Sequence, residues 1–178
     1  MALLSRALLV LAMVAGATNA AAKQSPAERA YYRAVAGFFQ VPESEIAILS
    51  HGAEVPADEI PVVLFLARAG GVSPEAVVAL RGSGRGWADL AQRFGVTASA
   101  LHVPLRDAGA AGAMAPLYQR FAATPTAQWV SMRLEEPEIV TLVNVRVLSQ
   151  ALGVEPDQVA GRTGTVASFV ELYGTFLH

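Results

Sequence analysis

Residues 63–94 read VLFLARAGGVSPEAVVALRGSGRGWADLAQRF, and residues 145–176 read VRVLSQALGVEPDQVAGRTGTVASFVELYGTF. The two stretches align without a gap at a constant offset of 82 residues. The identical positions are apolar residues and the glycine and proline of turns, which in the first stretch are Val63, Leu66, Ala69, Gly71, Val72, Pro74, Val77, Gly82, Leu90 and Phe94. None of them is a nucleophile, a histidine or a metal ligand, so the duplication predicts an architecture rather than a reaction.

A Gly-Val-x-Pro corner is the clearest turn signal in both stretches. In Gly71-Val72-Ser73-Pro74-Glu75 the glycine suits the left-handed conformation that ends a helix, and the serine and proline suit the start of the next helix. We expect Val72 to pack beneath the turn. The device recurs at Gly153–Asp157, with weaker versions at Val41-Pro42-Glu43 and Gly95-Val96-Thr97. The sequence therefore predicts helices joined by one kind of corner up to four times.

Helical periodicity covers most of the remaining chain. Ser25-Pro26-Ala27-Glu28 is typical of a helix start, and we expect helices over about 25–40, 43–50, 56–69 and 139–152. The helix at 56–69 is apolar on all sides, which predicts a central position. Gln128–Leu134 is a candidate extended segment, although its hydrophobic alternation is poor.

The predicted fold class is all-α, with two related helical units packed as a small irregular bundle. Each unit has a long helix, a Gly-Val-x-Pro corner, a short helix and a closing helix. The units span residues 23–106 and 117–178. Between them, residues 107–116 read DAGAAGAMAP, which is low in complexity and is interpreted as a flexible linker or exposed loop.

The N-terminus reads as an export signal. Arg6 precedes an apolar core at Ala7–Ala17, and small residues allow cleavage after Ala20 or Ala22. The predicted location is the bacterial periplasm or the extracellular space, and an uncleaved membrane anchor is the alternative. After cleavage no second membrane-spanning segment is predicted, because the longest remaining apolar run is far shorter than about 20 residues. The chain contains no cysteine, so it can use neither disulfides nor a lipoprotein anchor.

The charge balance argues against nucleic acid as a partner. The chain has 13 Lys and Arg against 15 Asp and Glu, a formal net charge of −2. Residues 90–105, LAQRFGVTASALHVPL, resemble the helix-turn-helix of bacterial regulators in the spacing of Ala91, Gly95 and Leu101. The second helix of that unit, Thr97–Val103, has no Lys or Arg to bind phosphate. A structural corner is the preferred interpretation.

Four residues are the candidate contacts with a ligand or partner: Trp87, Arg85, Asn144 and Arg146. Trp87 and its counterpart Phe169 are interpreted first as core anchors, with a binding role for Trp87 and Arg85 if the ring is exposed. Asn144 and Arg146 replace apolar residues of the first copy. They predict a solvated polar face on the second long helix, with a partner-binding face as the alternative.

No catalytic, metal or cofactor motif stands out. His51, His102 and His178 are isolated, without the spacings typical of metal sites, so no metal or cofactor is predicted. Glu135, Glu136 and Glu138 could form an acid and base pair, but are interpreted as residues that favour the start of a helix.

The dipeptide Glu43-Ser44 resembles the catalytic glutamate of helical peptidoglycan-cleaving enzymes, whose turn glycines and cleft motifs are absent here. The predicted function is an exported, non-enzymatic helical interaction or structural protein with another envelope protein as partner. The alternatives are a small envelope hydrolase with a single catalytic carboxylate, or a carrier of an apolar ligand.

Overall fold

The computed structural model describes residues 24–177, so the predicted export signal lies outside the described residues. Within them the chain forms ten α-helices and no β-strand, which confirms the all-α prediction. The helices are α1 (Pro26–Phe39), α2 (Glu43–Ala47), α3 (Ile60–Gly70), α4 (Pro74–Gly82), α5 (Trp87–Arg93), α6 (Ala98–Leu101), α7 (Ala115–Ala123), α8 (Glu136–Leu152), α9 (Pro156–Ala160) and α10 (Phe169–Thr175).

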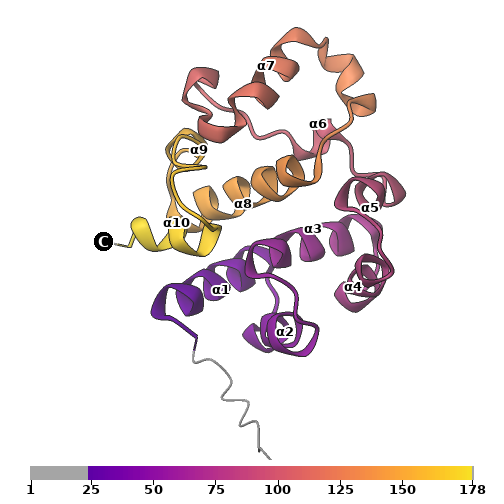
Figure 1. The fold of residues 1–178 in the computed structure, drawn as a ribbon, viewed down its shortest axis with the longest axis vertical. Helices are drawn as coiled ribbons and strands as arrows, with labels where there is room; N and C mark the ends of the chain where they lie inside the picture. Colours follow the sequence, from indigo (N-terminus) through magenta and orange to yellow (C-terminus); the bar gives the residue numbers. More distant parts are fainter. Residues whose placement is uncertain (1–23, 178) are drawn as a thin grey trace, which may run out of the picture.

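Helix α8 lies at the centre of the molecule. Figure 1 shows it between α1 and α3 on one side and α6 and α7 on the other, and α1, α3, α5, α6 and α9 contact it. Its residues Leu142–Val145 and Val147–Ser149 are all buried. The opposing α3 is buried continuously from Ile60 to Leu64. Burial on every side identifies these two helices as the core pair, as predicted for α3.

The bend after α3 is sharp. The chain turns by 115° between Ala57–Gly70 and Pro74–Gly82. Within residues 24–177 these two segments are the one bent pair that together has the length and hydropathy of a membrane span. No single helix in that range has both.

The helix starts follow their local signals. Ser25 Oγ accepts a hydrogen bond from Glu28 N at 3.0 Å and begins α1, as predicted. The helix predicted at 43–50 is divided into α2 and a π-helical turn, Ile48–Gly52. The helix predicted at 56–69 begins as a 3-10 turn, Ala57–Glu59, before α3.

All four predicted corners are present. Each has a residue in the left-handed conformation followed by a valine whose N–H bonds to the carbonyl five residues earlier. The pairs are Val41 and Ala36 (3.0 Å), Val72 and Ala67 (3.0 Å), Val96 and Ala91 (2.8 Å), and Val154 and Ser149 (3.0 Å). The corner glycines of the duplicated stretches are nearly superimposable in conformation, with φ and ψ of 61° and 32° at Gly71 and 66° and 31° at Gly153. These bonds satisfy carbonyls that the helix end leaves free.

One detail of the corner prediction is wrong. Val72 does not pack beneath the turn but is 38% exposed. Its neighbours at the end of α3, Arg68 and Ala69, are exposed too, so this corner lies at the surface and gives the valine side chain nothing to pack under.

The alanine- and glycine-rich segment 107–116, interpreted from its composition as a flexible linker or exposed loop, is exposed over most of its length. It forms two 3-10 turns, Ala108–Ala110 and Gly112–Met114, and Ala111 is fully buried. A Cβ atom at Gly112 would lie 2.3 Å from the carbonyl oxygen of Ala160. The small residues therefore allow close approach to α9 rather than freedom of movement.

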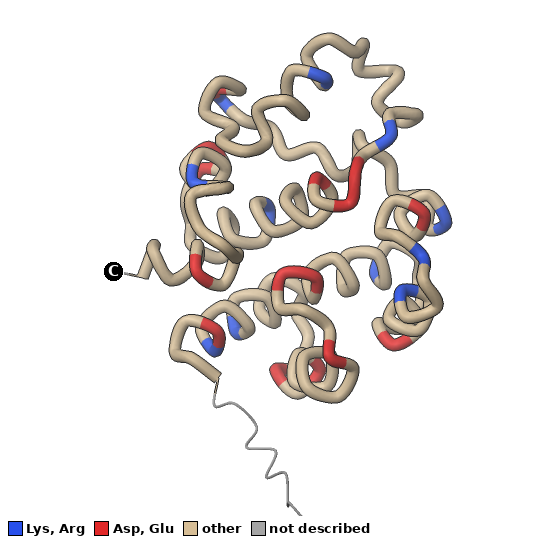
Figure 2. Tube along the Cα trace, viewed as in Figure 1, with Lys and Arg blue, Asp and Glu red and all other residues tan. Residues whose placement is uncertain are grey.

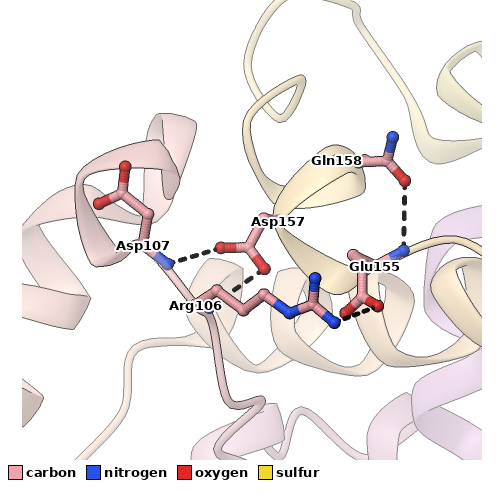
Figure 3. Close-up of polar contacts among 5 residues, drawn as sticks. All are labelled: Arg106, Asp107, Glu155, Asp157 and Gln158. Atoms are coloured by element: carbon pink, nitrogen blue, oxygen red, sulfur yellow. Dashed lines mark hydrogen bonds and ion pairs between the residues drawn. The ribbon is translucent and has the colours of Figure 1, made fainter.

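Polar contacts fasten this segment to the start of α9 (Figure 3). The Asp157 carboxylate accepts hydrogen bonds from the backbone N–H groups of Asp107, at 2.8 Å, and Arg106, at 3.2 Å. The Arg106 side chain forms an ion pair with Glu155 at 2.6 Å. These backbone hydrogen bonds hold the pKa of Asp157 below its usual value.

Candidate functional site

A surface groove of about 430 Å³ lies between the α5–α6 corner and the segment that precedes α8. We call it the corner groove. One wall is built from α5, the turn and α6, and the other is Val130–Leu134. The residues that line it are Ala88, Asp89, Ala91, Gln92, Gly95, Val96, Thr97, Ala98, Leu101, Val130, Ser131, Met132, Arg133, Leu134 and Ile139.

The helical wall is the stretch that resembles a helix-turn-helix. Gly95, at φ 69°, reverses the chain, and Thr97 Oγ1 accepts a hydrogen bond from Ala100 N at 3.3 Å to start α6. Ala91 and Ala98 are buried on either side of the turn, and Val96 N bonds back to the Ala91 carbonyl at 2.8 Å. The resemblance therefore corresponds to a tight structural corner.

The other wall is an irregular segment. Thr126–Ser131 forms a 3-10 helix, and Met132, at φ −67° and ψ 126°, turns the chain into an extended course up to α8. Thus the candidate extended segment at 128–134 is extended only in its second half. The N–H groups of Arg133 and Leu134 have no hydrogen-bond partner within residues 24–177.

Aromatic packing supports this wall from behind. The ring of Trp129 lies 4.5 Å from that of His102 and 4.8 Å from that of Phe121, measured between centroids. Its Nε1 donates to the carbonyl of Thr124 at 2.9 Å. Arg120 donates to the carbonyl of Arg133 and pairs with Glu138 at 2.7 Å. The wall is therefore fixed before any ligand arrives.

The corner groove is lined mainly by small and apolar side chains. Its ionisable residues are one carboxylate, Asp89, and one guanidinium, Arg133. Val130 is 61% exposed and adds an apolar rim. Figure 2 shows basic and acidic residues interspersed along the described chain. A groove with a short free backbone edge, small apolar side chains and one charge of each sign suits an uncharged or dipolar ligand.

Arg146 contacts the end of α6, which forms part of the groove wall. Its Nη2 donates to three carbonyls at the end of α6, those of Ala100, Leu101 and His102, at 2.9, 3.1 and 3.0 Å. Burial, reinforced by the nearby Arg146 charge, lowers the pKa of His102 below its usual 6.5. The guanidinium thus replaces hydrogen bonds that the end of a four-residue helix lacks.

Asn144 contradicts the prediction of a solvated face on α8, because it is 0% exposed. Its Oδ1 accepts from the Tyr31 hydroxyl at 2.5 Å, and its Nδ2 donates to the carbonyls of Asp58 and Val140, each at 2.8 Å. Burial raises the pKa of Tyr31 well above its usual value. The amide therefore links α1, the start of α3 and α8 inside the core, and a fully satisfied buried group of this kind specifies packing.

Trp87 is a core anchor, as predicted, with 1% of its surface exposed. The guanidinium carbon of Arg81 lies 4.7 Å from the ring centroid. Arg85 is exposed and accepts a bond from Arg81 at its carbonyl. Phe169, the counterpart of Trp87, is only half-buried, contrary to expectation. The reason is that α10 is covered mainly from the side of α1. The four candidate contact residues therefore do not converge on one site.

The glutamates at the start of α8 have structural partners. Glu138 Oε2 accepts from Glu135 N at 2.8 Å in a capping box, and Glu136 pairs with Arg81 at 3.1 Å. The predicted role at a helix start is confirmed. Glu43 is exposed and pairs with Arg33 at 3.6 Å. His51 is exposed and contacts Ser50 Oγ at 2.9 Å.

Sequence reasoning missed Asp58. Its Oδ1 and Oδ2 accept from Phe169 N at 3.0 and 3.1 Å, holding the start of α10. Burial raises the pKa of Asp58 more than the backbone hydrogen bonds of Phe169 and Val170 lower it. Asp58 lines neither described pocket. Its partner is 111 residues away, so no local pattern marks it.

Two searches give negative results. Within residues 24–177 no three His, Asp or Glu side chains are grouped closely enough to hold a metal ion. Comparison with known proteins finds no matching family model, no matching curated protein and no matching solved structure.

Proposed function

We propose that the protein is an exported, non-enzymatic helical binding protein of the bacterial envelope, and that the corner groove holds an extended segment of another envelope protein. The observation that carries this proposal is the Val130–Leu134 wall, where the N–H groups of Arg133 and Leu134 lack partners in the described chain. An extended peptide that adds as a β-strand pairs with one of these two groups by a main-chain hydrogen bond, because the N–H groups of consecutive extended residues point to opposite edges.

The other wall adds the specificity that backbone pairing lacks. Buried alanines and Val96 offer shallow apolar contacts, while Asp89 and Arg133 provide one charge of each sign. A segment with a small apolar residue flanked by polar ones is the expected occupant. Binding rather than hydrolysis is favoured because Asp58, a carboxyl with a raised pKa, lies outside the groove.

A carrier of an apolar small molecule is the second candidate. The groove volume of about 430 Å³ falls within the range of small-molecule sites, about 300–1,000 Å³. Native mass spectrometry of the protein purified from its own host separates the two, because a retained small molecule and a retained peptide differ in mass and in fragmentation.

The decisive experiment is peptide-library selection on the full protein, followed by titration of selected peptides into Gln92→Trp and Ser99→Trp variants. Gln92 is exposed and lines the groove, whereas Ser99 is exposed on α6 outside it. We expect binding to be lost only in Gln92→Trp, and the amide signals of Arg133 and Leu134 to shift in the wild type. Selected peptides that bind both variants equally would overturn the proposal.

We infer further that residues 63–94 and 145–176 are related stretches produced by duplication. Support comes from the matched corners at Gly71 and Gly153 and from α5 and α10, whose bounds differ by the same 82 residues. Export is part of the same proposal. N-terminal sequencing of the envelope fraction should give Ala21 or Lys23 as the first residue, and an intact Met1 would indicate a retained anchor instead.

A further inference from the structure

Two charged residues lie on opposite walls of the corner groove. Asp89 belongs to the first turn of α5, in the helical wall, and Arg133 belongs to the Val130–Leu134 wall. They are the two ionisable residues of the lining. Both are exposed, so an occupant of the groove can reach each of them.

Neither charge is neutralised within the described chain. None of the ion pairs among residues 24–177 involves Asp89 or Arg133. Arg93 follows Asp89 by one turn of α5 but does not line the groove. On the other wall, Glu138 pairs with Arg120, which contacts Arg133 only at its carbonyl. Each wall therefore presents one unpaired charge, and the two signs are opposite.

The two charges are carried by separate supports, which fixes their order across the groove. The start of α5 is held by Trp87 and Leu90, both of which are buried. The other wall is held through the bond from Arg120 to the carbonyl of Arg133. A segment with a basic residue beside Asp89 and an acidic one beside Arg133 is attracted at both walls. The same segment in the reversed direction places like charges together, which is penalised.

We propose that the corner groove selects extended segments that carry both a basic and an acidic residue, and that Asp89 and Arg133 fix the direction in which they bind. This inference rests on the proposed function, because it needs a peptide in the groove. In β-strand addition the side chain opposite Arg133 has its Cβ atom about 4.5–5.5 Å away, a position that favours the opposite charge. Exposed charges of this kind contribute specificity and association rate more than affinity.

The test is a parallel selection of a random heptapeptide phage library on the full wild-type protein and on two charge-reversal variants, Asp89→Lys and Arg133→Glu. We expect the wild type to enrich peptides with both signs, Asp89→Lys to enrich acidic peptides, and Arg133→Glu to enrich basic ones. Synthetic peptides selected on the wild type should bind each variant roughly three- to tenfold more weakly, mainly through slower association. The difference should shrink in about 1 M salt, where the Debye length is about 3 Å.

Matched controls make the same charge changes outside the groove. Arg93→Glu reverses an exposed arginine of α5, and Glu75→Lys reverses an exposed carboxylate in the first turn of α4. Neither residue lines the groove, so both variants should enrich the peptides that the wild type enriches. Thermal unfolding shows whether each variant folds. Asp89→Asn and Arg133→Gln, which remove a charge without reversing it, replace a reversal variant that does not fold.

The outcomes separate this inference from the proposed function. Peptides whose binding is lost in Gln92→Trp, but whose charges do not follow the reversal variants, would overturn the inference and leave the proposed function standing. Equal changes in Arg93→Glu and Arg133→Glu would overturn it too, because the overall field of the protein would then explain the selection. If no enriched peptide loses binding in Gln92→Trp, the proposed function itself is wrong, and this inference with it.

Discussion

The ends of α3 and α8 turn through the same corner, yet the two units close differently beyond it. In the first unit α4 has nine residues and the following helix starts at Trp87, which is fully buried. In the second, α9 has five residues and the following helix starts at Phe169, which is half-buried. The residues that recur therefore set the path of the chain, and those that differ set how tightly each unit closes.

A carboxylate at the beginning of each long helix lies beside the closing helix of the other unit. Glu136, at the start of α8, lies beside the start of α5. Its Oε1 is 2.2 Å from the position that a Cβ atom on Gly86 would take. Asp58, before α3, bonds to the first N–H of α10. Each long helix thus presents a carboxylate from its beginning to the closing helix of the other unit, where the helix dipole favours negative charge.

The largest effect should separate the two closing aromatics. Trp87→Ala removes a fully buried ring and should lower the free energy of unfolding by about 3–5 kcal/mol, a large part of the roughly 5–15 kcal/mol of a small domain. Phe169→Ala removes a half-buried ring and should cost clearly less. Urea denaturation of both variants measures the difference, and equal losses would contradict unequal closure.

The second difference between the units is the buried amide of Asn144 in α8, at the position that Val62 takes in α3. Asn144→Val installs the residue type of Val62, its counterpart in α3, and should cost about 1–3 kcal/mol. The Asp58 carbonyl loses the amide of Asn144, and the Tyr31 hydroxyl keeps only a long contact with the Ala57 carbonyl at 3.4 Å. Tyr31→Phe in the same background removes the stranded hydroxyl and should recover part of that loss. Additive losses in the double-mutant cycle would show that the two side chains do not interact.

Substitutions of the two corner glycines should destabilise the protein equally. Gly71→Ala and Gly153→Ala force a Cβ atom into the left-handed conformation and should each cost about 1–2 kcal/mol. Neither site has a steric neighbour within 4 Å, so the loss reflects backbone strain alone. Gly37→Ala, at an α-helical glycine with equal space, is the control and should stabilise the protein slightly. Thermal unfolding reports all three, and unequal losses at the two corners would indicate that their local support differs.

The sequence predicts the local features of this fold well and the long-range ones poorly. Ser25 and the corner glycines carry their signals within a few residues, so the start of α1 and all four corners are correct. The helix predicted at 139–152 instead begins at Glu136. The burial of Asn144 depends on Tyr31, 113 residues away, and therefore has no local signature. The composition of 107–116 is compatible with both a flexible linker and a closely packed turn, and the contact with Ala160 decides between them. The corner groove joins Gly95 to Leu134 across separate elements, so only half of it, the α5–α6 corner, could be recognised in advance.

The smallest effect concerns the pH dependence of stability. It involves His102 and Arg146, the second polar residue of α8 that stands where α3 has an apolar one. The folded pKa of His102 is lowered, mainly by burial and then by Arg146, so the folded state favours the neutral ring. The unfolded chain binds the proton more readily. Stability contributed by the neutral ring is therefore complete above the ordinary pKa of 6.5 and is lost as the pH falls from there through the folded pKa.

Arg146→Leu, which installs the residue type found at Leu64 in the first unit, separates the two causes. The variant removes the positive charge beside His102 but leaves the aromatic rings of Phe121 and Trp129 around it. We expect the His102 pKa, followed by the ring proton shifts, to rise in the variant while staying below 6.5, because burial is the larger cause. The acid side of the stability profile should flatten accordingly. A His102 pKa that does not change would show that the charge of Arg146 is neutralised elsewhere, and that its three hydrogen bonds to the end of α6 are its whole contribution to this wall of the corner groove.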